Sequence, residues 1–344
     1  MFMSINLNNN SQILIIHVSG RVGDSLYATP AIMAIKVAYP NSKISLLGHK
    51  NRLELFQNMP GINLIGSISN KRAKWRGWFT FKKYDLVIVF NHQEELLDIT
   101  RYALRVGKKT IAYKTSDEKI NDKLFIKLKP GPSIYSANAE PIAQGFLNIP
   151  MSMGIKKINQ RIRFFPTKEE INEAQSIIAK YSTGKGSFLI AYQIISFPTR
   201  AYRDWPVKNY ITLSKKIISQ VPNAHFLLFG SNEDKDKVQA VQNTLGNSRC
   251  TNLTGLSLRL TAAIMTKLNL YIGVNTGPTI MMSAFNVPLI GLYHGLLPSK
   301  LCAPKCFNKS ILIDHPKGSQ CNEHSSMAEI SVDKVFKAVL KTLN

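Results

Sequence analysis

Short apolar runs alternate along the chain with longer segments in which apolar residues recur at helical spacing. In the first half, this pattern predicts strands at residues 12–18, 43–47, 62–68, 84–90 and 109–114, and helices near 25–38, 93–105 and 135–148. In the second half, it predicts strands at 187–193, 224–229, 268–273 and 287–292, and helices at 167–181, 207–220, 233–244, 257–266, 277–285 and 331–343. Such alternation of strands and helices predicts parallel sheets covered by helices on both faces.

The pattern restarts after a break near residues 150–166, and a chain of 344 residues is long enough for two domains. We expect an α/β protein of two Rossmann-like, doubly wound domains that face a cleft. The expected boundaries are residues 1–160 and 161–330, followed by a C-terminal helix at 331–344. Ligands of such sheets bind outside the carboxyl ends of the strands, so the loops that follow strands are the candidate sites.

The charge of the chain is strongly positive and unevenly distributed. The net charge is +23, and residues 1–165 hold 24 basic and 10 acidic residues, while residues 166–344 hold 20 and 11. Such a field attracts nucleic acid, anionic lipid headgroups or phosphorylated sugars, and the bias predicts that an anionic partner docks on the first half. The alternative is a proteome in which most proteins are basic.

Other features of the composition favour a cytoplasmic protein. No apolar run reaches the roughly 20 residues of a membrane span, and the polar start MFMSINLNNN is unlike a signal peptide. The four cysteines, Cys250, Cys302, Cys306 and Cys321, all lie in the last third, which is unlike a disulfide framework. The spacing of the last three is unlike a standard zinc pattern, so we expect no metal.

The first candidate loop follows the strand predicted at 12–18 and reads Ser19-Gly20-Arg21-Val22-Gly23-Asp24. It is neither a dinucleotide fingerprint nor a Walker loop. The two glycines permit a tight turn and the close approach of a ligand. Asp24 is either a plain helix N-cap or a general base that accepts the proton of an attacking hydroxyl.

The second candidate loop lies within residues 271–282, YIGVNTGPTIMM, between a predicted strand and a predicted helix. Thr276 is a possible cap, Gly277 permits close approach, and Pro278 suits a first helical turn. The loop contains no acid, so its free N–H groups are a candidate diphosphate site. The alternative is an ordinary strand–helix turn.

Three more residues of the second half are candidates for binding a nucleotide. Thr199 and Arg203 lie in PTRAYRDWP, after the strand predicted at 187–193, and the arginine could hold a phosphate. Glu233, in FGSNED after the strand predicted at 224–229, could accept hydrogen bonds from ribose hydroxyls. The alternatives are an ordinary surface arginine and a first-turn helix acid.

Residues 71–83, KRAKWRGWFTFKK, combine six basic residues with four aromatic ones and no acid. This mixture suits an anionic, partly apolar surface, such as a membrane interface or a phosphorylated glycolipid. It also suits single-stranded nucleic acid, or a solvated loop whose aromatic side chains return to the core. Nearby basic residues could extend the patch: Arg101, Arg105, Lys108 and Lys109.

Taken together, these stretches resemble the ADP-heptose:lipopolysaccharide heptosyltransferase family (glycosyltransferase family nine). The motifs that carry the resemblance are Gly23-Asp24-Ser25-Leu26, Thr29-Pro30-Ala31, Arg203-Asp204-Trp205-Pro206, Asn275-Thr276-Gly277-Pro278, Val287-Pro288 and the Ile-Ser-Val-Asp of residues 330–333. Their order and spacing cover nearly the whole chain. The resemblance implies a GT-B fold, with the donor in the C-terminal domain and the acceptor in the N-terminal one.

The resemblance also implies an inverting transfer of heptose from ADP-heptose to a hydroxyl of the lipopolysaccharide inner core, with no metal and no cofactor besides the donor. It assigns Asp24 as the base and implies donor binding by Thr199, Arg203, Glu233, Asn275, Thr276, Gly277, Pro278 and Thr279. The residues expected to bind the acceptor are Gly23, Ser25, Lys71, Arg72, Lys74, Trp75, Arg76 and Arg101. The partners are then an anionic glycolipid and the cytoplasmic face of the inner membrane, and no nucleic acid is expected.

The chain departs from the family at three positions. Asn275 stands where the family usually has Asp, Ile280 where it commonly has His, and Leu297 within a loop that usually reads Gly-Pro-Thr-Asp-Pro. A pocket that loses polar contacts changes what it selects. Two alternatives therefore stay open: the same chemistry with another nucleotide sugar or acceptor, and a non-enzymatic binder of polyanions.

Overall fold

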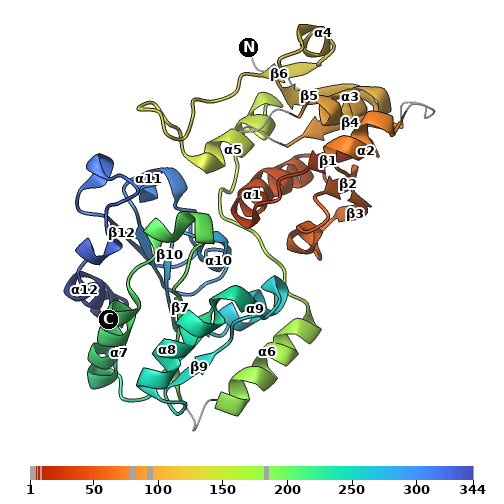
Figure 1. The fold of residues 1–344 in the computed structure, drawn as a ribbon. Coiled ribbons are helices and arrows are strands. Elements are labelled where there is room, and N and C mark those ends of the chain that lie inside the picture. Colours follow the sequence, from red (N-terminus) through yellow and green to blue (C-terminus); the bar gives the residue numbers. More distant parts are fainter. Residues whose placement is uncertain are drawn as a thin grey trace. The chain divides into compact units, whose positions relative to one another are not determined.

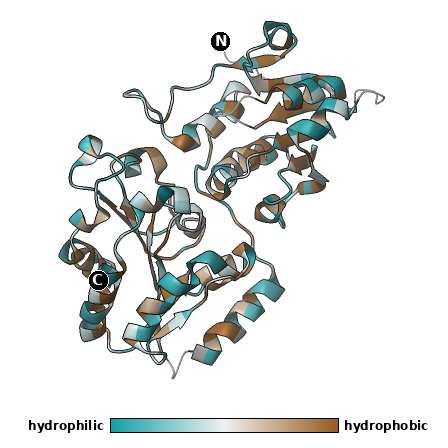
Figure 2. Ribbon diagram, viewed as in Figure 1, coloured by the Kyte–Doolittle hydropathy of each residue, from teal (hydrophilic) through white to brown (hydrophobic). Residues whose placement is uncertain are grey.

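The computed structural model describes residues 5, 7, 10–77, 83–90, 96–181 and 186–343. The chain forms two compact units, Met1–Phe165 and Pro166–Asn344. Each unit contains one six-stranded sheet whose neighbouring strands are parallel, with helices on both faces (Figure 1). In Figure 2 the central strands are mostly hydrophobic and the outer helices are more mixed, as expected for sheets buried on both faces.

The sheet of the first unit has the order β3-β2-β1-β4-β5-β6. Its strands are β1 (Gln12–His17), β2 (Lys43–Gly48), β3 (Ile62–Ser67), β4 (Tyr84–Val89), β5 (Gly107–Tyr113) and β6 (Ile126–Leu128). The helices α2 (Asn70–Trp75) and α3 (Leu97–Val106) pack together on one face. The helices α1 (Val22–Ala38) and α5 (Ile142–Ser152) pack together on the other. Two short helices, η1 (Leu53–Phe56) and α4 (Glu118–Asn121), lie in loops.

The sheet of the second unit has the order β12-β11-β10-β7-β8-β9. Its strands are β7 (Phe188–Gln193), β8 (Ala224–Phe229), β9 (Cys250–Asn252), β10 (Leu270–Val274), β11 (Leu289–Tyr293) and β12 (Ser310–Asp314). One face packs on α7 (Val207–Gln220), α8 (Lys235–Leu245) and α12 (Val332–Leu343). The other helices are α6 (Lys168–Tyr181), α9 (Leu258–Met265), α10 (Gly277–Met282) and α11 (Ser299–Cys302), with short 3-10 turns η2 (Pro198–Arg203), η3 (Asn232–Asp234), η4 (Gly318–Gln320) and η5 (Met327–Glu329).

Both sheets have the same Rossmann-type strand order, in which the chain starts in the middle and builds outward in two directions. The reversal falls between β1 and β4 in the first unit and between β7 and β10 in the second. The predicted fold class of two doubly wound α/β units is therefore confirmed. In such sheets the loops after the two strands at the reversal diverge and leave room for a ligand.

The sequence Leu26-x-x-Thr29-Pro30 explains how α1 continues through a proline. Pro30 has no N–H, so it leaves the Leu26 carbonyl without its usual helical donor. The Thr29 hydroxyl donates to that carbonyl at 2.7 Å and accepts the Arg163 N–H at 2.9 Å. The Thr29 side chain thus replaces the hydrogen bond that Pro30 cannot make, and it also binds the segment that ends the first unit.

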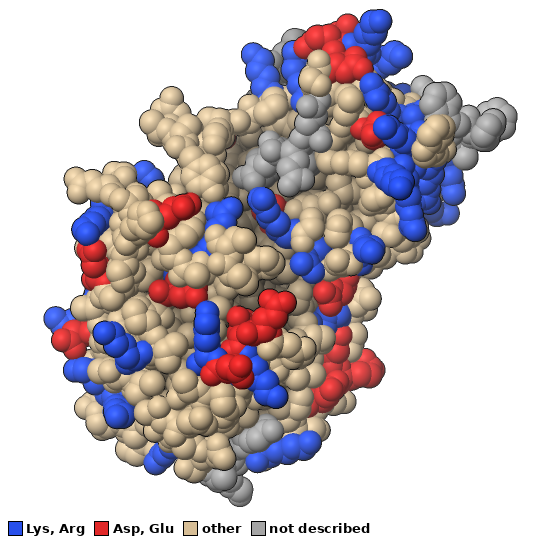
Figure 3. Space-filling view, in the orientation of Figure 1, with Lys and Arg blue, Asp and Glu red and all other residues tan. Residues whose placement is uncertain are grey.

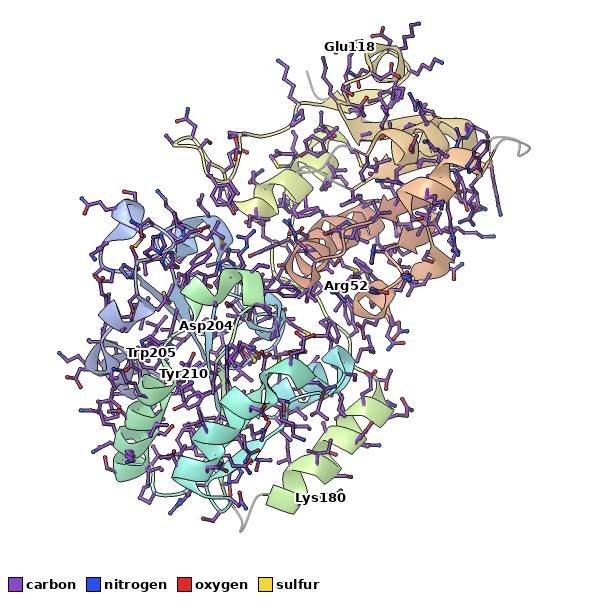
Figure 4. The ribbon with its side chains drawn as sticks, in the orientation of Figure 1. Arg52, Glu118, Lys180, Asp204, Trp205 and Tyr210 are labelled. Atoms are coloured by element: carbon purple, nitrogen blue, oxygen red, sulfur yellow. The ribbon has the colours of Figure 1, made fainter. Side chains whose placement is uncertain are left out.

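The Trp205-Pro206 pair anchors the second unit in a similar way. The indole of Trp205 is 1% exposed, donates to the Ile330 carbonyl at 2.8 Å, and packs edge-on against Tyr210 at 4.9 Å between ring centroids (Figure 4). Pro206 is the N-cap residue of α7. Two motifs 125 residues apart in the chain, Arg-x-Trp-Pro and Ile-Ser-Val-Asp, therefore meet in the core of one unit.

Some elements differ from their predictions. The helix expected at 135–148 begins only at Ile142, because Pro141 is its N-cap residue, and it continues to Ser152. The helix expected at 93–105 is α3, and residues 93–95 lie outside the described part of the chain. The strands β6, β9 and β12 and the helices α2, α4 and α11 were not predicted. Four of them, β6, β9, α4 and α11, have only three or four residues, which is too few to show a periodic pattern.

Candidate functional site

Asp24 lies at the point where the strand order of the first sheet reverses. Helix α1 begins at Val22 with Arg21 as its N-cap residue, so Asp24 lies in the first helical turn and the alternative of a plain N-cap is wrong. Its carboxylate is half-buried and accepts a hydrogen bond from the Ser19 hydroxyl at 3.1 Å. That hydroxyl in turn accepts the Arg21 N–H at 3.2 Å. The carboxylate is therefore oriented by its own loop and stabilised as an anion by the helix N-terminus.

The surroundings of Asp24 are partly buried and partly open. Gly23 is half-buried, but Ser25 is fully buried, and its hydroxyl lies 3.3 Å from His17 Nε2. The Ser25 hydroxyl is thus engaged in the core, which weakens the assignment of Ser25 as an acceptor-binding residue. On the outer side, Arg52 Nε donates to the exposed Gly20 carbonyl at 2.7 Å and holds the turn (Figure 4).

The predicted basic segment forms α2 and the turn after it. Lys71, Arg72, Trp75 and Arg76 line a hollow of about 680 Å³ on the surface. The Trp75 side chain is 79% exposed, so it does not return to the core. Figure 3 shows Lys and Arg side chains gathered over this end of the first unit. The arrangement suits an anionic and partly apolar partner.

Arg105 holds the basic helix in place. Its guanidinium donates to the Ala73 carbonyl and, at 3.0 Å, to the Arg76 carbonyl, both at the C-terminal end of α2. A cation that bonds the last carbonyls of a helix stabilises that end. Lys74 belongs to the same helix and is exposed. Arg105 is thus a support of the patch rather than a part of its open surface.

Other basic residues expected in the patch are engaged within the protein. Arg101 forms ion pairs with Asp98 at 3.3 Å and Asp117 at 3.1 Å, and Lys108 pairs with Asp85 at 2.9 Å. The charge of Arg101 is thereby balanced, which weakens its assignment as an acceptor-binding residue. The aromatic residues Trp78, Phe79 and Phe81 lie outside the described residues.

Arg203 lies in η2, after β7, at the point where the second sheet reverses. Its Nε is buried and has no hydrogen-bond partner, and no acidic side chain forms an ion pair with Arg203 within the described residues. Its guanidinium carbon lies 5.4 Å from the centre of the Tyr202 ring, and Nη2 donates to the Tyr202 hydroxyl at 3.3 Å. A guanidinium held in this way lacks its usual anion, and a phosphate would supply it.

The loop that carries Arg203 is closed by its own hydrogen bonds. Asp204 accepts the Ser196 N–H at 2.7 Å, and the Ser196 hydroxyl donates to the Arg200 carbonyl at 2.7 Å. Burial raises the pKa of Asp204, although the bonds from Ser196 oppose this effect. The next residue, Trp205, is the buried anchor of α7 (Figure 4). The position of Arg203 is therefore fixed from both sides along the chain.

The loop after β10 supplies the other side of the same reversal. Thr276 is the N-cap residue of α10 but its side chain makes no capping bond, so the expectation that it caps is wrong. Its hydroxyl instead donates to the Val274 carbonyl at 3.3 Å, as the Thr279 hydroxyl does at 2.6 Å. Pro278 occupies the first turn, as predicted. The first N–H groups of α10 are thus left without a side-chain cap.

Asn275 and Arg203 both act on the thiol of Cys302, the last residue of α11. The Asn275 side chain hydrogen-bonds this thiol, and the charge of Arg203 acts on the same thiol, while burial raises the pKa of Cys302 to about 11. Ile280 and Leu297, the two other departures from the family pattern, are each 6% exposed. The three replaced positions are therefore buried, and two of them present no polar group to a ligand.

Thr199 and Glu233 are exposed. Glu233 lies in η3, after β8, in the first turn, where the neighbouring Asp234 forms the capping box with Ser231. Since β8 is the neighbour of β7, this loop lies at the same edge of the sheet as Arg203. In the described part of the chain, neither Thr199 nor Glu233 forms a hydrogen bond or ion pair with the other candidate residues, whereas Arg203 and Asn275 both act on Cys302.

Three residues near Arg203 were missed by sequence reasoning. Gln193, the last residue of β7, is 4% exposed, and its Oε1 has no hydrogen-bond partner. Tyr202 packs against Arg203 and, on its other side, against His294 at 4.9 Å between ring centroids. A polar residue at the end of an apolar strand was the available signal for Gln193. Tyr202 and His294 had none, because their contact joins residues far apart in the chain.

Within the described part of the chain, no three side chains of His, Cys, Asp and Glu come together as metal ligands. The four cysteines are free thiols. Nor does any helix among the described residues have the length and apolarity to cross a membrane.

Comparisons with known proteins agree with these features. Residues 180–328 match glycosyltransferase family 9 (heptosyltransferase). Lipopolysaccharide heptosyltransferase 3 of Escherichia coli is 23% identical over 79% of this chain and 80% of its own length. The lipopolysaccharide core heptosyltransferase OpsX of Haemophilus influenzae is 21% identical over 79% of this chain and 76% of its own length.

Solved structures show the same fold. A family 9 glycosyltransferase of Veillonella parvula superposes with a TM-score of 0.78 at 18% identity, over 98% of both chains. ADP-heptose lps heptosyltransferase II of E. coli superposes with a TM-score of 0.75 at 16% identity, over 96% of this chain and 98% of the other. The heptosyltransferase WaaC of E. coli, solved with ADP, gives a TM-score of 0.68 at 15% identity over 96% and 99%.

The two sheets with their reversal points, together with these superpositions, show that the chain has the GT-B fold. More particularly, the predicted resemblance to the heptosyltransferases of glycosyltransferase family 9, whose curated members act in lipopolysaccharide synthesis, is confirmed.

Proposed function

We propose that this protein is an inverting glycosyltransferase that transfers a heptose from ADP-heptose to a sugar hydroxyl of the lipopolysaccharide inner core. The observation that carries the donor half is Arg203, an arginine with a buried, unpartnered Nε beside the acid-free loop from Asn275 to Thr279. Such a constellation is suited to a diphosphate. Support comes from WaaC, which has been solved with ADP and with ADP-2-deoxy-2-fluoro heptose.

In the proposed reaction, Asp24 removes the proton of the acceptor hydroxyl as that oxygen attacks the anomeric carbon. The bond from this carbon to the diphosphate breaks, and the configuration inverts. Arg203 and the first N–H groups of α10 stabilise the negative charge that develops on the leaving diphosphate. Protein groups supply this positive charge, so the proposal includes no metal ion and no cofactor besides the donor.

The acceptor half of the proposal rests on the charge of the first unit. The phosphorylated inner core of lipopolysaccharide is anionic, and α2 presents Lys71, Arg72, Lys74 and Arg76 around the exposed Trp75. Cationic side chains bind phosphates, and an exposed indole suits the polar–apolar boundary of a glycolipid. We propose that the enzyme works at the cytoplasmic face of the inner membrane, where such a lipid would be modified.

A second candidate function keeps the chemistry and changes the donor or the acceptor. It is favoured by the buried Ile280 and Leu297 and by Asn275, whose side chain is engaged with Cys302. A pocket with fewer polar groups would select a sugar by shape more than by hydroxyl contacts.

Thermal stabilisation by ADP, ADP-heptose and a panel of UDP-, GDP- and CMP-sugars tests these alternatives. A ligand that binds only the folded state raises the melting temperature. A shift with ADP and a larger shift with ADP-heptose is the expected result, and transfer to core acceptors would follow as the activity assay. A shift with another nucleotide sugar alone would favour the second candidate. Salt-sensitive binding of oligonucleotides, without any response to nucleotide sugars, would instead indicate a non-enzymatic polyanion binder.

A further inference from the structure

Two buried histidines occupy equivalent positions at the ends of neighbouring strands. His294 follows β11 and is 0% exposed, and His315 follows β12 and is 2% exposed. Their rings make the same bonds. Each Nδ1 accepts a backbone N–H from two residues further along, from Leu296 at 3.3 Å and from Lys317 at 3.2 Å. Each Nε2 faces a carbonyl of the segment just before η5, that of Ser325 at 3.2 Å for His294 and that of Ser326 at 3.0 Å for His315.

This bonding pattern fits the neutral form of the His294 ring. A nitrogen that accepts an N–H carries no proton, so the single proton of this form lies on Nε2, where it is donated to the Ser325 carbonyl. The two rings lie 5.5 Å apart between centroids, so they support each other by direct contact.

A short series of contacts connects His294 to Arg203. The imidazole packs edge-on against the Tyr202 ring, with centroids 4.9 Å apart and an interplanar angle of 69°. The Tyr202 hydroxyl accepts hydrogen bonds from Arg203 Nη2 at 3.3 Å and from Arg200 Nη1 at 3.5 Å. The Arg203 guanidinium also lies over the Tyr202 ring. Tyr202 is thus held between a neutral imidazole and the cation assigned to the diphosphate.

Protonation of His294 would disturb this arrangement. The new N–H on Nδ1 would oppose a backbone N–H donor, and the new positive charge would repel Arg203. Burial lowers the pKa of His294; the bond to Ser325 opposes this effect, and the neighbouring His315 and Arg203 add to it. The titratable and charged groups that face the two rings are Tyr202, Arg203, Cys321, whose sulfur lies 3.0 Å from His315 Nδ1, and Glu329, which pairs with Lys317.

We propose that His294, supported by His315, is a positioning residue that aligns Arg203 for the donor diphosphate through Tyr202, and that it does so only while neutral. This inference rests on the proposed role of Arg203 in binding the donor. The inference predicts that the affinity for the donor decreases at acidic pH. Because the pKa of His294 lies below its ordinary value of 6.5, affinity is complete above that pH and falls as the pH decreases through the folded-state pKa.

The test is the dissociation constant of ADP, and of inorganic pyrophosphate, from pH 5 to pH 8.5 for the wild type, His294→Asn and His294→Phe. Asn retains an acceptor for the Leu296 N–H, and Phe retains a ring for Tyr202. If one variant does not fold, the binding test can be made with the other. Phosphates also titrate in this range, so the quantity to compare is the ratio of variant to wild type at each pH. Circular dichroism and the melting temperature report folding.

The expected result at pH 8 is about tenfold weaker binding in His294→Asn, with an unchanged acceptor KM. In His294→Phe the ratio should approach one as the pH falls, since the wild type then loses its neutral imidazole. The matched control is His225→Asn. His225 is also buried, and burial lowers its pKa, but it lies in β8 and bonds Thr251 at 2.8 Å. The control should leave ADP binding unchanged.

A double-mutant cycle with Arg203→Ala separates this inference from the proposed function. If His294 acts through Arg203, adding His294→Asn to Arg203→Ala causes no further loss of affinity. If Arg203→Ala binds ADP and pyrophosphate as the wild type does, the proposed function fails. The positioning role is overturned by any of three results. Arg203→Ala could weaken ADP binding while His294→Asn does not, or the double variant could lose affinity by the product of the two single losses. The third is a loss of ADP affinity in His225→Asn equal to that in His294→Asn.

Discussion

The loop after β1 in the first unit and the loop after β7 in the second lie at equivalent positions, because both sheets reverse their strand order there. Their chemistry is opposite. The first loop leads into a carboxylate, Asp24, which a neighbouring hydroxyl orients. The second carries the guanidinium of Arg203, whose Nε has no partner. Under the proposed function, the same backbone position would serve an acceptor that gives up a proton in one unit and a leaving group that gains negative charge in the other.

This difference teaches how one topology provides two functions. The strand order fixes where a ligand can approach, and a few side chains in the loops decide which charge it meets. An acid beside a diphosphate would repel it, and the loop from Asn275 to Thr279 contains none. Five predictions test the contrast between the two units, and they are ordered from the largest expected effect to the smallest.

The largest effect is expected from a substitution at Asp24. We expect Asp24→Asn to lower kcat for transfer by about 100- to 10,000-fold, because an amide cannot accept the acceptor proton. ADP affinity should stay unchanged, since the proposal assigns the donor to the other unit. Ser19→Ala, which removes the orienting hydroxyl but keeps the carboxylate, should lower kcat much less. Transfer by Asp24→Asn at nearly the wild-type rate would remove the assignment of the base.

The separateness of the units can be tested through their stability. Arg259, 6% exposed in α9, forms a bidentate pair with Glu170 of α6, at 2.5 and 2.8 Å. We expect Arg259→Met to lower the free energy of unfolding of the second unit by about 3 kcal/mol, because it leaves a carboxylate without its partner. Adding Glu170→Gln should recover part of this loss. Equal destabilisation of both units, seen by hydrogen exchange, would show that they do not unfold separately.

The stability that the Arg259–Glu170 pair provides should also depend on pH. Burial is the largest single effect on the pKa of Glu170 and raises it. The bonds from Arg259 and from the Thr167 N–H, together with the charge of Arg259, outweigh burial, so the net pKa lies below the ordinary 4.5. The stabilisation is therefore present above that pH and is lost as the pH falls through the folded-state pKa. The difference in melting temperature between the wild type and Arg259→Met should shrink below pH 4.5.

Arg203 is the counterpart of Asp24 in the second unit. We expect Arg203→Ala to weaken ADP binding by about 10- to 150-fold, which corresponds to the loss of charge-assisted hydrogen bonds. The acceptor KM should not change. Arg200→Ala is the matched control, because Arg200 bonds the same Tyr202 hydroxyl yet is not assigned to the phosphate. An equal loss in both variants would mean that the loop needs positive charge in general.

The smallest expected effect lies on the surface of the first unit. Trp75→Ala should weaken binding to vesicles that contain phosphorylated inner-core lipopolysaccharide by about three- to tenfold. The melting temperature should not change, because the side chain is 79% exposed. Arg101→Ala is the control, since Arg101 is paired with Asp98 and Asp117. If Arg101→Ala weakens binding as much as Trp75→Ala, the hollow at α2 is not the preferred contact.

Much of the fold followed from local patterns. The long strands and helices were predicted because each shows several periods of an apolar pattern, as β4 and α7 do. The three-residue strands β6 and β9 were missed because their pairing comes from neighbouring strands rather than from their own residues. The sequence placed Asp24 after a glycine turn, but the beginning of α1 at Val22 depends on the packing of that turn, including the bond from Arg52 to Gly20.

The sequence by itself determined the two-unit α/β architecture, the loops that carry Asp24 and Arg203, and the excess of positive charge. Each of these follows from local sequence patterns or from composition and needs no knowledge of which distant residues meet. The tertiary structure decided which basic side chains remain open and which are paired, as with Trp75's neighbours and Arg101. It also decided that His294 meets Tyr202, and that Trp205 meets Ile330. These contacts join residues about 90 and 125 positions apart in the chain, and only the folding of the whole second unit brings them within reach.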